Sequence, residues 1–191
     1  MKLFELLNGC PGIIDGPDRP AGFPDIEIRH ITADSRQVTD GALFIAVKGG
    51  TADGHAYIDQ AIQNGAAAVM VQDDVSKNIP MIRVANSRQA MAHTAAQFYG
   101  HPSRELVLVG ITGTNGKTSI TWMLESIFRV CGHKTGVIGT ISIRFGQTET
   151  ASAMTTPDSI ELQKTLFQMK TAGITHVVME VSSHGLDLHR V

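Results

Sequence analysis

The loop at residues 110–119 (GITGTNGKTS) has the residue types of a site that cradles the phosphates of a nucleoside triphosphate. Gly113 and Gly116 have no Cβ, so the backbone can curl and direct successive N–H groups onto phosphate oxygens. Lys117 would supply a mobile ammonium to the β- and γ-phosphates, and Thr118 a hydroxyl to a magnesium ion. We therefore expect ATP with Mg²⁺ as the ligand of this loop.

The segments that flank the loop support this expectation. Residues 106–110 are a continuous apolar run, which is typical of a strand in a parallel sheet covered on both faces. Residues 118–130 carry apolar positions at helical spacing, and the positive end of that helix would add to the anion site. The general pattern G-x-x-x-x-G-K-[ST] is broken at its first position, where Ile111 stands. A glycine-rich turn that only packs a helix on a strand is the simpler alternative.

The remaining C-terminal residues continue an α/β pattern. Apolar runs at 135–141 and 175–181 predict two more strands, and Pro157 at the first position opens a helix that ends at Gly173. This alternation predicts a doubly wound parallel sheet, with Glu180 at the edge where ligands bind in open α/β folds. Because only three parallel strands are expected, we predict a truncated sheet with an unfinished edge.

The N-terminal residues predict a smaller α/β domain. Strands are expected at 43–47, 68–71 and 81–84, and helices at 57–64 and 86–99, each followed by a glycine. His101-Pro102 then looks like a joint between domains. We therefore expect an N-terminal domain at residues 1–103 and a doubly wound domain at 104–191.

Composition excludes several classes of protein. A formal net charge of -2 without a basic run argues against nucleic-acid binding. No apolar run approaches the roughly 20 residues that span a bilayer, and Met1 begins no signal-peptide pattern. Cys10 and Cys131 form no CxxC motif and are expected to be structural thiols. A cytoplasmic protein is the expectation.

Five short segments resemble the Mur ligases, the amino-acid ligases of peptidoglycan precursor synthesis and hence of cell wall biogenesis, cell shape and cell division. Residues 113–118 (GTNGKT) are similar to the family's ATP loop, which does not require the glycine missing at 111. Residues 32–36 (TADSR) and 53–55 (DGH) look like the N-terminal domain, which holds the UDP end of the substrate. Residues 154–158 (MTTPD) and 179–186 (MEVSSHGL) resemble the member that adds the third residue.

The resemblance implies roles for individual residues. Catalysis is assigned to Lys117 and Glu180, and the metal to Thr118 and Glu180. ATP would be held by Gly113, Thr114, Asn115, Gly116, Lys117, Thr118 and Ser119. The UDP part of the substrate would be held by Ala33, Ser35, Gly50, Thr51 and Ala52, and the muramoyl-dipeptide arm by Thr155, Thr156, Ser182 and Arg190.

Some of these residues have simpler readings. Thr155-Thr156 could cap the helix that follows, and Arg190 could be a solvated terminal charge. Ser182 and His184 could suggest a nucleophile and its base, but no G-x-S-x-G elbow is present. His55, after Asp53-Gly54, reads as a turn residue rather than a metal ligand.

The resemblance implies an ATP-dependent ligase. ATP would phosphorylate the free carboxylate of UDP-MurNAc-L-Ala-D-Glu, and a diamino acid would displace phosphate from the acyl phosphate to form an amide. The family's carbamylated lysine, second histidine segment and amino-acid-selecting C-terminal domain do not fall within residues 1–191. We therefore expect the isolated chain to be poorly active, the complete enzyme to be monomeric, and the choice between diaminopimelate and lysine to stay open.

Two alternatives belong to other classes. One is a non-catalytic nucleotide-binding module. The other is a P-loop kinase or GTPase, although the chain has no Asn-Lys-x-Asp motif and the UDP-domain segments would then have no role.

Overall fold

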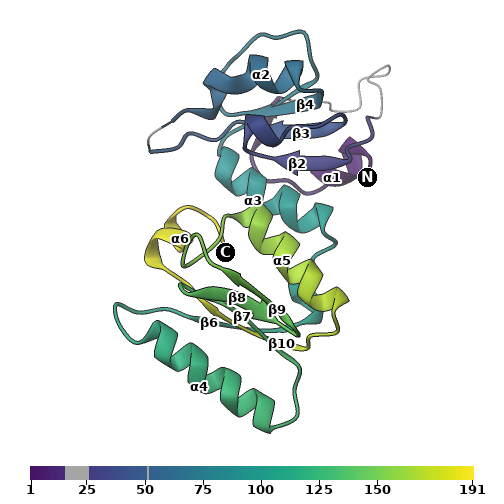
Figure 1. The fold of residues 1–191 in the computed structure, drawn as a ribbon. Coiled ribbons are helices and arrows are strands. Elements are labelled where there is room, and N and C mark those ends of the chain that lie inside the picture. The colour runs from purple at the N-terminus through teal and green to yellow at the C-terminus, as the bar shows by residue number, and fades with distance from the viewer. Residues whose placement is uncertain (16–25, 51) are drawn as a thin grey trace. The chain divides into compact units, whose positions relative to one another are not determined.

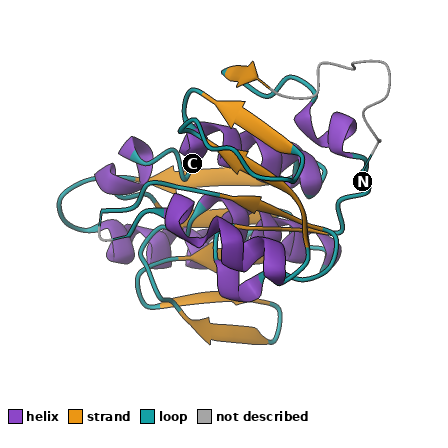
Figure 2. Cartoon of the chain, turned by 90° about the horizontal axis from the view of Figure 1, so that it is seen from above, coloured by secondary structure: helices purple, strands orange, loops and turns teal. Residues whose placement is uncertain are grey.

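The chain forms two compact units, Met1–Phe98 and Tyr99–Val191. The computed structural model describes residues 1–15, 26–50 and 52–191. Each unit combines one five-stranded sheet with helices (Figures 1 and 2), which confirms the expected α/β class. The division falls a few residues before the joint expected at residue 103, and the domain boundary stays a prediction.

The first unit has the strand order β1-β5-β4-β3-β2. Four strands are parallel, and β1 is antiparallel to its neighbour β5. The strands are β1 (Ile13–Asp15), β2 (His30–Thr32), β3 (Ala42–Ile45), β4 (Ala66–Val71) and β5 (Met81–Val84). The helices are α1 (Leu3–Leu7), α2 (Ile58–Gln63) and α3 (Ser87–Phe98), with 3-10 turns η1 (Ser35–Gln37) and η2 (Gly54–Tyr57).

Strand β3 is apolar throughout because both of its faces are covered. Phe44 joins a buried cluster with Ile58 and Ala61 of α2. Leu43 and Ile45 are also fully buried, and strand alternation points them to the opposite face. A strand covered on both faces reads as a continuous apolar run rather than an alternating one, which is why this element could be found in the sequence.

The second unit has the strand order β6-β10-β7-β8-β9. The three expected parallel strands are present, and β8 and β9 add an antiparallel hairpin. The strands are β6 (Val107–Ile111), β7 (Thr135–Ile138), β8 (Ser142–Phe145), β9 (Thr148–Ala151) and β10 (His176–Glu180). The helices are α4 (Lys117–Val130), α5 (Ser159–Thr171) and α6 (Ser183–Asp187), with a 3-10 turn η3 (Pro102–Glu105).

The hairpin was not expected, and the strand placed at 135–141 ends earlier, at Ile138. Gly146 has φ +56° in the two-residue turn between β8 and β9, a conformation that glycine adopts without strain. Ile143 and Phe145 pack against the buried cluster, whereas Arg144 points to the other face and pairs with Glu125 of α4. This alternation is the local signal of a strand with one buried face.

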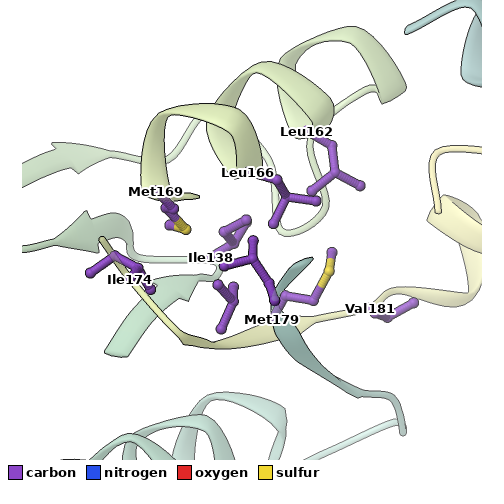
Figure 3. Close-up of a cluster of buried hydrophobic side chains, with 9 residues drawn as sticks. Ile138, Leu162, Leu166, Met169, Ile174, Met179 and Val181 are labelled. Atoms are coloured by element: carbon purple, nitrogen blue, oxygen red, sulfur yellow. The ribbon is translucent and has the colours of Figure 1, made fainter. Parts of the chain in front are cut away.

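Helix α5 covers one face of this sheet. Its Leu162, Leu166 and Met169 form a buried cluster with residues of β7 and β10 (Figure 3). Helix α4 packs on the opposite face (Figure 1). Asp158 caps α5, because its carboxylate accepts hydrogen bonds from the N–H groups of Ile160 and Glu161 at 3.0 Å each. The expectation that Pro157 is the first helical residue was therefore wrong, since Pro157 precedes the cap.

The outer side of α4 and the edge strand β6 are apolar and exposed. Ile120, Met123 and Ile127 of α4 are 44%, 63% and 54% exposed. Within the described residues β6 pairs only with β10, so β6 is the open edge that the sequence led us to expect. None of the described helices combines the length and the apolar character needed to cross a membrane.

Candidate functional site

The glycine-rich loop connects the end of β6 to the start of α4. Gly113 has φ +145° and Gly116 has φ +80°, and both values lie in the region that favours glycine. Gly116 is the N-cap of α4, so the first free N–H groups of a 14-residue helix face the loop. The Nζ of Lys117 donates to the Gly113 carbonyl at 2.6 Å, which closes the loop on itself.

Glu180 lies beside this loop because β10 pairs with β6, with Glu180 in register with Ile111. Its side chain is buried, and the residue is only 2% exposed. The Thr118 hydroxyl donates to the carboxylate, with oxygen–oxygen distances of 3.1 and 3.0 Å. The structure therefore joins the two residues that the sequence assigned to a metal.

Thr140, which the sequence analysis missed, supplies the other two hydrogen bonds to this carboxylate. Its backbone N–H donates to Oε1 of Glu180 at 3.1 Å, and its hydroxyl donates to Oε2 at 2.9 Å. Gly139 precedes it, and a Cβ at that position would lie only 2.6 Å from Oε1 of Glu180. The position of Gly139-Thr140 directly after an apolar strand was a usable signal, because the same reasoning identified Glu180.

A pocket of roughly 390 Å³ brings these groups together. Its lining residues are Thr114, Asn115, Gly116, Lys117, Thr118, Ser119, Thr140, Thr155 and Glu180. Helix N–H groups and one ammonium suit phosphate oxygens, whereas hydroxyl and carboxylate oxygens suit a hard cation such as Mg²⁺. The residues present therefore fit a magnesium-bound nucleoside triphosphate.

The threonines expected to hold the substrate arm differ in their surroundings. Thr155 lines the pocket, and its hydroxyl oxygen is 3.1 Å from that of Thr140. Thr156 is buried, and its hydroxyl donates to the Glu180 carbonyl at 3.1 Å while accepting from the Ser182 N–H at 2.9 Å. Neither threonine caps α5, because Asp158 does so. A substrate contact remains a prediction for both.

Ser182 and Arg190 are also engaged with the protein. The Ser182 hydroxyl caps α6 by accepting from the Gly185 N–H at 3.0 Å. Arg190 donates from Nη1 to the Thr156 carbonyl at 2.8 Å, so it is not a free terminal charge. Both side chains stabilise the segment after β10, and their roles in substrate binding remain predictions.

The first unit contains a separate pocket of roughly 630 Å³ at the carboxyl ends of β2 and β3. Three of the residues expected to contact the UDP part line it, namely Ala33, Ser35 and Ala52. Gly50 is exposed and does not belong to the lining, and Thr51 lies outside the described residues. The other lining residues are Asp34, Arg36, Phe44, Val47, Gly54, Tyr57 and Gln60.

Two sets of hydrogen bonds shape this pocket. Ser35 is buried, and its hydroxyl donates to Oε1 of Gln60 at 2.7 Å. Asp34 receives two hydrogen bonds from the Arg36 side chain, at 2.9 and 2.7 Å. These hydrogen bonds hold the pKa of the Asp34 carboxyl below its ordinary value. The pair fixes the direction of Arg36 at the pocket, although an exposed ion pair adds little stability.

His55 connects the pocket loop to the end of β4. Its Nδ1 lies 2.6 Å from Oδ1 of Asp53, and its Nε2 accepts from the backbone N–H groups of Gln72 and Asp73 at 3.0 and 3.2 Å. The proton of the neutral ring must therefore sit on Nδ1 and point to Asp53. Asp53, His55 and Asp73 lie close enough together to suggest a metal site, but both ring nitrogens of His55 already have protein partners. The geometry favours the structural role expected for His55.

We expect His55→Ala to lower the free energy of unfolding by about 1–3 kcal/mol, because the Gln72 and Asp73 N–H groups lose their acceptor. The measurement is urea denaturation followed by circular dichroism. His93→Ala is the matched control, because the His93 ring makes an exposed contact with the Asn8 carbonyl that water can replace. Equal losses in the two variants would contradict the structural role of His55.

Comparisons with known proteins match both units to the same family. Residues 111–191 match the Mur ligase middle domain, and residues 27–99 match the Mur ligase family catalytic domain. The UDP-N-acetylmuramoyl-L-alanyl-D-glutamate–2,6-diaminopimelate ligase of Geobacillus kaustophilus is 45% identical over 191 residues. The ligase of the same name from Bacillus cereus is 46% identical over 191 residues. The chain spans 38% of the length of each of these relatives.

Solved structures show the same fold. A UDP-N-acetylmuramoyl-L-alanyl-D-glutamate–2,6-diaminopimelate ligase superposes with a TM-score of 0.81 at 23% identity, covering 100% of this chain and 37% of that one. The MurF ligase of Thermotoga maritima in complex with ADP superposes with a TM-score of 0.56 at 25% identity, covering 84% of this chain and 34% of that one.

Proposed function

Because the chain belongs to the Mur ligase family, we propose that it forms the UDP-precursor-binding and nucleotide-binding parts of an ATP-dependent ligase. The ligase adds 2,6-diaminopimelate to UDP-MurNAc-L-Ala-D-Glu during peptidoglycan precursor synthesis in the cytoplasm. Identity of 45% over the full 191 residues to a ligase of that name supports this substrate pair. The observation that carries the proposal is the single pocket that unites the glycine-rich loop, Thr118 and Glu180.

The second unit binds MgATP in this proposal. The N–H groups at the start of α4 and the ammonium of Lys117 neutralise phosphate charge. The Lys117 ammonium has three N–H donors, so it can donate to phosphate oxygens while it keeps its 2.6 Å contact with the Gly113 carbonyl. Thr118 and Glu180 would hold the magnesium ion, which would neutralise phosphate charge.

The first unit binds the UDP part of the precursor in its own pocket. That pocket combines apolar side chains, such as Phe44 and Val47, with the polar groups of Asp34, Ser35 and Arg36. Such a mixture suits a nucleobase and sugar next to a charged diphosphate. This assignment accounts for a second pocket that a simple P-loop kinase or GTPase would not need.

The reaction requires little covalent chemistry from the chain itself. A carboxylate of the precursor receives the phosphoryl group of ATP, and the amine of the diamino acid then displaces phosphate. The residues of this chain act by holding the reacting groups in place and by neutralising charge in the transition state. The relatives are longer than this chain, so we expect the 191 residues alone to bind ligands but to turn over little.

The proposal is tested with the 191-residue chain and with the full product of its gene. Calorimetric titration of the chain with UDP-MurNAc-L-Ala-D-Glu should show binding, with UDP-N-acetylglucosamine as the weaker comparison. The full product should form the tripeptide and ADP with diaminopimelate, and mass spectrometry should detect less product with lysine. A full product that binds ATP but makes no amide with either diamino acid would favour the alternative, a non-catalytic nucleotide-binding module.

A further inference from the structure

Glu180 is a buried acid whose immediate partners carry no charge. None of the ion pairs among the described residues includes it. Its carboxylate instead receives hydrogen bonds from Thr118 and from both polar groups of Thr140. A buried carboxylate held only by neutral donors is costly, which indicates that this position serves a ligand rather than stability.

Thr140 holds each carboxylate oxygen with a different group. The backbone N–H faces Oε1 and the hydroxyl faces Oε2, so the plane of the carboxylate is fixed from one residue. Gly139 permits this approach, since a side chain there would collide with Oε1 at 2.6 Å. Gly139 and Thr140 therefore hold the Glu180 carboxylate in place, and neither residue has an assigned role in the proposed reaction.

The start of the hairpin of β8 and β9 holds Gly139 and Thr140 in position. Thr140 lies in the turn between β7 and β8, where the Gly139 N–H donates to the Ser142 carbonyl at 3.2 Å. The Thr140 hydroxyl also lies 3.1 Å from the hydroxyl oxygen of Thr155. Because Thr140 gives its only hydroxyl proton to Glu180, Thr155 is the donor in that contact. Thr140 thus connects Glu180 to a residue assigned to the substrate arm.

We propose that Thr140 is a positioning residue that holds the Glu180 carboxylate in the orientation needed to bind a divalent cation together with Thr118. The inference rests on the proposed nucleotide site. Partners that orient a metal-binding carboxylate contribute strongly to affinity, and their loss usually costs about 10–100-fold. Thr140 acts through Glu180 and is not itself assigned to the phosphates.

The test separates cation binding from nucleotide binding. ADP affinity is measured by calorimetry in EDTA, and Mn²⁺ affinity is measured in the presence of ADP by electron paramagnetic resonance of free Mn²⁺. We expect Thr140→Val to weaken Mn²⁺ binding by about tenfold and to leave the metal-free ADP affinity within about twofold. Thr140→Ser keeps the hydroxyl and should restore Mn²⁺ affinity to within about threefold of the wild-type chain.

Thr135→Val is the matched control, because Thr135 is the first residue of β7 and lies at the opposite end of that strand. It should change neither affinity. Unchanged Mn²⁺ affinity in Thr140→Val, with normal ADP binding, would overturn the positioning role while leaving the nucleotide site intact. A loss that Thr140→Ser fails to restore would also overturn it. A wild-type chain that binds no ADP would overturn the proposed function and this inference together.

Discussion

Lys117→Ala is expected to weaken MgATP binding to the chain by roughly 10–150-fold. A hydrogen bond to a charged group contributes about 1.5–3 kcal/mol, and the ammonium of Lys117 is the only cationic side chain in the pocket lining of the described residues. The backbone N–H groups of the loop remain in the variant, so binding should weaken rather than disappear. Isothermal titration calorimetry with MgATP gives the dissociation constants.

The folded state should be almost unaffected by this substitution. The contact of Lys117 with the Gly113 carbonyl is solvent-exposed, and its loss leaves no buried group without a partner. Lys164→Ala is the matched control, since Lys164 lies on α5 in an exposed pair with Glu161 and should not affect MgATP affinity. A Lys117→Ala chain that binds MgATP within about threefold of wild type would refute the assignment of the loop.

Glu180→Gln is expected to weaken cation binding without lowering the stability of the fold. The amide can keep the hydrogen-bond pattern of the carboxylate, because its oxygen can face the Thr140 N–H while its NH₂ donates to hydroxyls that turn to accept. The substitution removes a buried charge, so the thermal midpoint should stay the same or rise. Mn²⁺ affinity in the presence of ADP should fall by about 100-fold or more, because the loss of a ligand should cost at least as much as the loss of a partner that orients one.

Glu125→Gln provides the contrasting control in the same unit. Glu125 is also buried, but it pairs with Arg144 and with Arg129, so its charge is compensated. Removing that charge should lower the free energy of unfolding by about 1–3 kcal/mol without affecting Mn²⁺. If Glu180→Gln destabilised the chain as much as Glu125→Gln and kept its Mn²⁺ affinity, Glu180 would be a structural acid.

The parts of the fold that could be predicted are those in which burial or backbone geometry determines the types of consecutive residues. Strands β3 and β10 are continuous apolar runs, and β10 places Glu180 at the sheet edge that the sequence indicated. The glycine-rich loop could be found because its backbone angles require glycine at 113 and 116. In each case one physical constraint, burial or the backbone angles, determines which residue types occur side by side in the sequence.

The hairpin of β8 and β9 could not be predicted from the sequence in the same way. Only Ile143 and Phe145 of its residues pack on the cluster, and β9 is exposed along its whole length, so the apolar pattern is weak. Because the hairpin was not predicted, Thr140 was not predicted as a site residue either, since the turn between β7 and β8 determines its position. The structure was needed to bring Thr140 onto Glu180, because the two residues are 40 positions apart in the chain.

The buried hydroxyls are a second limit of sequence reasoning. Thr156 and Ser35 were assigned to ligands because of the resemblance, yet each hydroxyl makes a hydrogen bond inside the protein. A hydroxyl can serve a ligand, a helix end or the backbone, and its residue type does not distinguish these uses. Their contacts with the precursor remain predictions that a structure with bound ligand would decide.

The close approach of Gly139 to Glu180 has a consequence for how the gene can vary. Every change of a glycine codon to that of another amino acid adds at least a Cβ, and a Cβ at position 139 would lie 2.6 Å from Oε1 of Glu180. The codon for Gly139 should therefore accept only synonymous changes for as long as position 180 is a glutamate. Across homologous genes the two positions should vary together, and a lineage that loses the acid should be the one in which the glycine codon becomes free to change.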